Sequence, residues 1–277
     1  MNKEQIKHIT NQHYRELKKH IKTVAGDFNV EDIHQFRVAY KKLRAFLRMI
    51  SPVAGIPGKI EISKKLKRAY NISGQIRDLQ LQQDRIMAAI KKDLKKPLAY
   101  LRMLRKEIGK LKPELSEIFL ENPVTECKMK TDASVPEEFP LTNFRNFVQK
   151  NWNAVYAIIV SGHFSDDNIH TIRKCLKDLF YNLKTYEGVE REILSLSVWK
   201  VKDEPYFNKL LDELGSFQDR CASIALLKSW WLNSLNASNL EMLERLKRSW
   251  IKDKAGMKLL LVKRLKADLI PERLHSN

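Results

Sequence analysis

The sequence has few glycines and prolines and lacks a long apolar run. Nine glycines and nine prolines in 277 residues are too few for the many tight turns of an all-β protein. A membrane span needs about 18 consecutive apolar residues, and apolar stretches such as YAIIV at 156–160 are far shorter. The amino-terminal MNKEQIKHITNQHYREL also lacks the apolar core of a signal peptide. These absences exclude an all-β protein and predict no membrane span.

Cysteine is scarce as well. The three cysteines, Cys127, Cys175 and Cys221, are odd in number and none belongs to a CxxC pair. This pattern is unlike a disulfide scaffold and fits a reducing compartment, so we expect a cytoplasmic protein. Because no HxxxH, HExxH or cysteine cluster occurs, we expect no metal site and no cofactor.

The residues that dominate the chain are strong helix formers, namely Leu, Lys, Arg, Gln, Glu and Ala. With 43% hydrophobic residues the chain can bury a real core, and an all-α fold is predicted. Apolar spacing predicts helices over 3–23, 30–51, 60–73, 76–95, 97–111, 141–161, 166–187, 190–199, 204–214, 217–234, 238–252 and 256–269. In this interpretation Gly74 and Gly215 each mark a break or bend between consecutive helices.

Positive charge is in large excess. The formal net charge is +18, from 51 basic and 33 acidic side chains. Most of the excess lies in residues 1–121, which hold 27 basic and 13 acidic residues. Such a balance predicts a polyanionic partner or surface, and nucleic acid, anionic lipid and polyphosphate all remain open on this count.

The chain contains an internal repeat. A shift of 136 aligns Asn29 with Ser165, Ile33 with Ile169, His34 with His170, Arg37 with Arg173, Lys41 with Lys177, and Leu43 with Leu179. A shift of 141 then aligns Arg68 with Lys209, Gly74 with Gly215, and Asp78 with Asp219. We therefore predict two related halves, at 1–120 and 141–277, joined by a proline-containing linker at 121–140.

The helix that begins near residue 30 has a basic face without acids. At about 100° per residue, five cation-capable side chains fall within roughly 80° of arc; they are His34, Arg37, Lys41, Arg44 and Arg48. In the second copy, His170, Arg173, Lys177 and Lys184 share a face, with Lys174 at its margin. A solvated surface is the plain alternative, but like charges one turn apart repel, so exposed helices usually mix signs.

Further cations precede the repeat glycines. We predict that Lys64 and Arg68 in the first copy and Lys209 in the second contribute to the same anion-binding surface. Asp78 and Asp219 fit structural roles better, such as capping or pairing with a nearby base. Arg77 has no basic counterpart, since Gln218 occupies the equivalent position, and it ranks below the others.

The two blocks HQFRVAYKKLRAFLRMI with ISGQIRDLQ, and IHTIRKCLKDLFYNLKTY with LDELGSFQDR, strongly resemble the two repeats of the CHAD domain, the conserved histidine α-helical domain. The resemblance implies two antiparallel four-helix bundles related by a pseudo-twofold, with a basic channel between them. It also implies binding of inorganic polyphosphate and, for some members, association with polyphosphate granules. Phe180 and Asp178 depart from the family pattern, which predicts a weaker second half.

The favoured hypothesis is thus a polyphosphate-binding protein without enzymatic activity. A nucleic-acid-binding helical protein is the rival, although Phe36, Tyr40 and Phe46 lie opposite the cations and not among them. A third hypothesis is an accessory module to a phosphoanhydride-cleaving enzyme. Catalysis by this chain itself is disfavoured, because the basic faces offer no carboxylates for Mg²⁺ and no Walker-type loop occurs.

Overall fold

The protein is an assembly of α-helices, described by a computed structural model over residues 1–51, 60–90, 96–182, 185, 204–227 and 229–269. Within these ranges there is no β-strand. The helices are α1 (Lys3–Asp27), α2 (Val30–Ile50), α3 (Lys64–Ala89), α4 (Leu98–Leu120), α5 (Pro123–Ser134), α6 (Leu141–Ser161), α7 (Asp166–Asn182), α9 (Glu204–Leu226), α10 (Ser229–Leu232) and α11 (Ala237–Leu269). The all-α prediction is confirmed.

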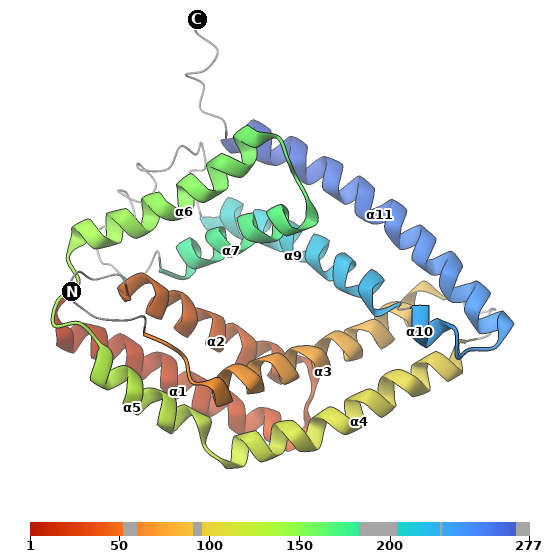
Figure 1. The fold of residues 1–277 in the computed structure, drawn as a ribbon, viewed down its shortest axis with the longest axis horizontal. Helices are drawn as coiled ribbons and strands as arrows, with labels where there is room; N and C mark the ends of the chain where they lie inside the picture. Colours follow the sequence, from red (N-terminus) through yellow and green to blue (C-terminus); the bar gives the residue numbers. More distant parts are fainter. Residues whose placement is uncertain (52–59, 91–95, 183–184, 186–203, 228, 270–277) are drawn as a thin grey trace, which may run out of the picture.

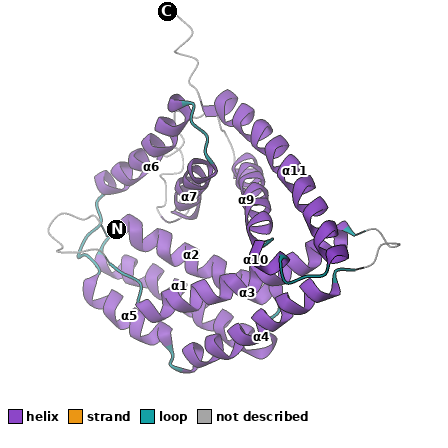
Figure 2. Ribbon diagram, turned by 45° about the vertical axis from the view of Figure 1, so that its right-hand side comes forward, coloured by secondary structure: helices purple, strands orange, loops and turns teal. Residues whose placement is uncertain are grey.

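Four inner helices are covered by outer ones. In Figures 1 and 2, α2, α3, α7 and α9 lie centrally, with α1 and α4 outside on one side and α6 and α11 outside on the other. Helices α1 to α4 pack in chain order against one another, and α6, α7, α9 and α11 do the same. The two groups meet where α2 packs on α7 and α3 on α9. That the two groups of helices arose by internal duplication stays a prediction.

Side-chain caps start the two basic helices where the sequence predicts. Asn29 accepts a hydrogen bond from the backbone N–H of Asp32 at 2.8 Å, and Ser165 accepts one from Asn168 at 3.0 Å. First-turn acids follow each cap, which suits the positive end of a helix dipole. Both predicted N-caps are confirmed.

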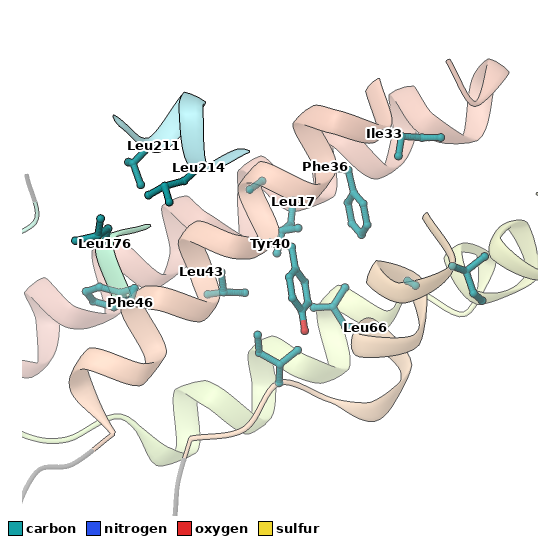
Figure 3. Close-up of a cluster of buried hydrophobic side chains, with 14 of the residues drawn as sticks. Leu17, Ile33, Phe36, Tyr40, Leu43, Phe46, Leu66, Leu176, Leu211 and Leu214 are labelled. Atoms are coloured by element: carbon teal, nitrogen blue, oxygen red, sulfur yellow. The ribbon is translucent and has the colours of Figure 1, made fainter. Parts of the chain in front are cut away.

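The apolar face of α2 fixes how the helix is rotated. The predicted core residues Phe36, Tyr40, Leu43, Phe46, Leu47 and Ile50 are all buried, and Figure 3 labels Phe36, Tyr40, Leu43 and Phe46 in the core. Burying one such side chain stabilises the fold by about 1.5–3 kcal/mol. Together the six buried side chains fix the rotation of α2, so that its basic face points away from the core. On α7, Ile172, Leu176 and Leu179 are buried in the same way, whereas predicted core residues Leu183 and Tyr186 lie outside the described residues.

The predicted breaks at Gly74, at Gly215 and between 252 and 256 are wrong. Helix α3 runs through Gly74, α9 runs through Gly215, and α11 runs through Gly256 without interruption. Helix α4 likewise continues through Pro113 to Leu120. Glycine inside a helix costs about 1 kcal/mol relative to alanine but does not end the helix. At Gly74 and Gly215 the missing side chain makes room for an arginine of a neighbouring helix.

The segment predicted as a linker, 121–140, is not irregular throughout, because it contains α5. Pro123 occupies the first helical position, where its missing N–H is tolerated, and Asn122 precedes it in the left-handed conformation. Helix α5 packs on α1 and α3, and Cys127 from α5 is buried. The segment therefore belongs to the packed structure of the first group of helices.

Candidate functional site

A cavity of about 710 Å³ lies among the four inner helices. It brings together eight of the predicted site residues from two parts of the chain far apart in sequence: His34, Arg37, Lys41, Arg44 and Arg48 of α2, and His170, Arg173 and Lys177 of α7. All eight are half-buried. The basic faces of α2 and α7 thus face one shared cavity, here called the basic cavity.

Each repeat arginine lies on a helical glycine. A Cβ atom at Gly74 would be 2.8 Å from Cζ of Arg37, and one at Gly215 would be 3.3 Å from Nη2 of Arg173. The first distance is a clash and the second a tight contact. Glycine at these two positions therefore lets a guanidinium of one helix rest directly on the backbone of the next.

Two further contacts hold the Arg37 guanidinium in its position on Gly74. Its Nη1 donates a hydrogen bond to the carbonyl oxygen of Tyr70 at 2.5 Å, and its Cζ lies 4.2 Å from the centroid of the Tyr70 ring. Tyr70 also stacks on Tyr40, with ring centroids 4.1 Å apart. Charge-assisted hydrogen bonds and cation–π contacts of this kind orient the guanidinium before any ligand arrives.

Three predicted site residues are not part of the basic cavity. Lys64, Arg68 and Lys209 are exposed and do not line it, and Arg68 forms an ion pair with Glu114 at 2.7 Å. Arg68 and Lys209 each precede the repeat glycine by six residues, which turns the side chain about 120° away from it. Lys184, also predicted, lies outside the described residues.

Several residues that the sequence ranked low or missed line the cavity. Arg77 and Gln218, the unequal pair of the repeat, both contribute to it, as do Tyr70, Lys174 and Tyr181. Nδ1 of His170 lies 3.0 Å from Oε1 of Gln218. Tyr70 and Arg77 lie four residues before and three after Gly74, so helical spacing from the glycine would have found them.

A family model for the CHAD domain matches residues 8–228. The chain belongs to the CHAD-domain family. No curated protein matches it. Among solved structures, the crystal structure of the CHAD domain from the plant Ricinus communis is similar with a TM-score of 0.70 and 16% identity, covering 97% of this chain and 91% of that chain. This likeness concerns the fold.

Cations in the cavity of this CHAD domain are crowded. Burial, reinforced by Arg37 and other cations, lowers the pKa of Lys41 to about 7. Burial and then Arg173 lower the pKa of Lys177, its partner in the repeat, to about 8. Burial also lowers the pKa of His34 and His170. In the absence of an anion, positive charge in this cavity is therefore unfavourable.

Carboxylates come mainly from the opposite wall, formed by α3 and α9. Asp78, Asp212 and Asp219 line the cavity there. Asp219 pairs with Arg85 at 3.2 Å, in line with the predicted pairing role. Burial raises the pKa of Asp78. Within the described residues, no group of three or more His, Cys, Asp or Glu side chains has an arrangement that could hold a metal ion.

Across the described ranges, none of the helices is both long and apolar enough to cross a membrane.

Proposed function

We propose that the CHAD domain binds inorganic polyphosphate, a linear polyanion, in its basic cavity and does so in the cytoplasm. The observation that carries this proposal is the convergence of the α2 and α7 cations on one cavity. Crowded cations repel one another, and a bound polyanion turns that repulsion into attraction. The guanidinium forks can grip phosphate oxygens, while Lys41 and Lys177 act as point charges.

The arrangement of aromatic rings favours polyphosphate over single-stranded nucleic acid. Proteins that bind single strands stack bases on exposed aromatic faces. In this cavity Tyr70 already stacks on Tyr40 and packs against Arg37, at 4.1 and 4.2 Å. The Tyr70 ring thus already contacts two side chains, and Nζ of Lys177 lies 5.5 Å from the centroid of Tyr181, a second tyrosine that lines the cavity.

Catalysis finds less support than binding. Phosphoryl transfer normally uses carboxylates that hold Mg²⁺ beside the phosphates. Among the described residues four aspartates line the cavity, but Asp178 is paired with Arg48 and Asp219 with Arg85, so two of the four are already neutralised by arginines. We therefore propose a binding module and not a phosphoanhydride-cleaving enzyme.

Competition between two polyanions tests the proposal. We expect long-chain polyphosphate to displace labelled single-stranded DNA from the protein at matched charge and salt, and DNA to displace polyphosphate poorly. Because binding releases counterions, affinity should fall steeply with salt; neutralising about six phosphates costs a nucleic-acid binder about a thousandfold between roughly 50 and 200 mM. Preferential displacement of polyphosphate by DNA would contradict the proposal.

Binding should also take up protons near neutral pH. In the empty cavity the pKa values of Lys41 and Lys177 are lowered to about 7 and about 8. A bound polyanion raises both, because an opposite charge favours the protonated form. Affinity should therefore fall as pH rises above about 7. Calorimetry at pH 8 in two buffers of different ionisation heat measures the proton uptake, and proton release on binding would contradict the assignment.

A further inference from the structure

Arg48 of α2 and Asp178 of α7 form an ion pair between two cavities. Both residues line the basic cavity, and both also line a second pocket of about 620 Å³. The pair is well shielded, with 31% of the Arg48 side chain and 14% of the Asp178 side chain exposed. The carboxylate thus satisfies an arginine that would otherwise be open to an anion in either cavity.

The second pocket has donors on its α6 side. Asn143, Asn146 and Lys150 line it and fall within about 60° of arc on α6. Helix α6 contains no acidic residue, and Asp178 is the one carboxylate among the described residues that line the pocket. The larger, apolar part of the wall is formed by residues that include Met49, Phe147, Ala154 and Cys175. Amide N–H groups and an ammonium suit an anion along the polar side.

We propose that a long phosphate chain held in the basic cavity continues into the second pocket by displacing Asp178 from Arg48. Arg48 then exchanges a carboxylate oxygen for a phosphate oxygen, and the chain gains Lys150 and the amides of α6. A short chain, satisfied within the basic cavity, leaves the ion pair intact. Asp178 thereby sets a preference for long chains, and this inference rests on the proposed function.

A purely structural ion pair predicts something different. If Arg48 and Asp178 only joined α2 to α7, then Asp178→Asn would lower thermal stability and change affinity for short and long chains alike. If the pair is a displaceable barrier, the substitution removes the competitor for Arg48. It then strengthens the binding of long chains selectively.

The test compares tripolyphosphate with long-chain polyphosphate by calorimetry, per binding site. We expect Asp178→Asn to raise the affinity for the long chain several-fold relative to tripolyphosphate. Lys150→Glu should lower the same ratio several-fold, because Lys150 lies in the second pocket but not in the basic cavity. Lys19→Glu, an equal charge change at an exposed position of α1 outside both cavities, should leave the ratio unchanged.

Two outcomes would overturn the inference and they are distinguishable. An unchanged ratio in both Asp178→Asn and Lys150→Glu removes the second pocket from the path while leaving the basic cavity as the binding site. Failure of the wild-type protein to bind either ligand removes the proposed function itself. Because Lys150 is exposed, its substitution tests the path even if loss of the ion pair unfolds the Asp178 variant.

Discussion

Reversing Arg37 and Arg173 together is expected to abolish polyphosphate binding while leaving the protein helical. Both side chains line the basic cavity, one from each half of the chain. Losing one charge-assisted hydrogen bond at each site costs about 1.5–3 kcal/mol, and about 1.4 kcal/mol is a tenfold change in affinity. Removal alone should thus weaken binding at least about a hundredfold, and the introduced carboxylates repel the ligand further.

A charge-matched control separates the site from the overall charge. Lys19→Glu with Lys106→Glu removes the same net charge from exposed positions on α1 and α4 that line neither cavity. We expect this variant to bind polyphosphate with a modest loss. Circular dichroism and thermal melting establish that both double variants are folded. Wild-type affinity in the folded Arg37→Glu, Arg173→Glu protein would refute the site assignment.

The second large effect is expected at Gly74. Alanine is favoured over glycine in a helix by about 1 kcal/mol, so a substitution with no steric consequence should stabilise the protein. At Gly74 the added Cβ would meet Arg37, with Cζ at 2.8 Å, and push the guanidinium off Tyr70. Gly74→Ala should therefore reduce polyphosphate affinity about tenfold or more, since at least one oriented charge-assisted bond is lost.

Alanine substitutions at the other helical glycines are the controls for this prediction. Gly215→Ala should have a smaller effect, because Nη2 of Arg173 is 3.3 Å from the added Cβ and a shift of a few tenths of an ångström relieves that contact. Gly109→Ala and Gly256→Ala meet no atom within 4 Å and should raise the melting temperature without changing affinity. In an Arg37→Ala background, Gly74→Ala should lose most of its effect on binding. Equal effects of Gly74→Ala in both backgrounds would show that the glycine does not act through Arg37.

Helical periodicity predicted the basic face of α2 well, because six apolar residues on the other side leave the helix one way to face the core. The same reasoning on α7 succeeded for His170, Arg173 and Lys177, whose apolar partners are equally regular. Sequence alone therefore predicted most of the cavity wall formed by these two helices. Their function as ligands of polyphosphate stays a prediction.

The wall formed by α3 and α9 was harder to predict. Gly74 and Gly215 look like helix breaks in a sequence, and only the packing of Arg37 and Arg173 on them explains why glycine stands inside a helix. Placing Lys64 and Arg68 at the site followed from their charge and ignored their angle to Gly74. For α5, proline and small polar residues suggested a linker, since a short helix that packs through few side chains has little apolar periodicity.

Because α2 and α7 lie far apart in sequence and pack side by side to form one wall of the basic cavity, the cavity is incomplete until the second half of the chain has been synthesised. A ribosome that has extruded only residues up to 120 presents the α2 cations without α7 or α9 to face them. The exposed cations of such a nascent chain attract polyanions without selectivity, and salt weakens this attraction. If the basic cavity is the binding site proposed above, the complete site forms only after Leu226 has emerged and α9 has docked, so selectivity for a ligand would arise late in the synthesis of the chain.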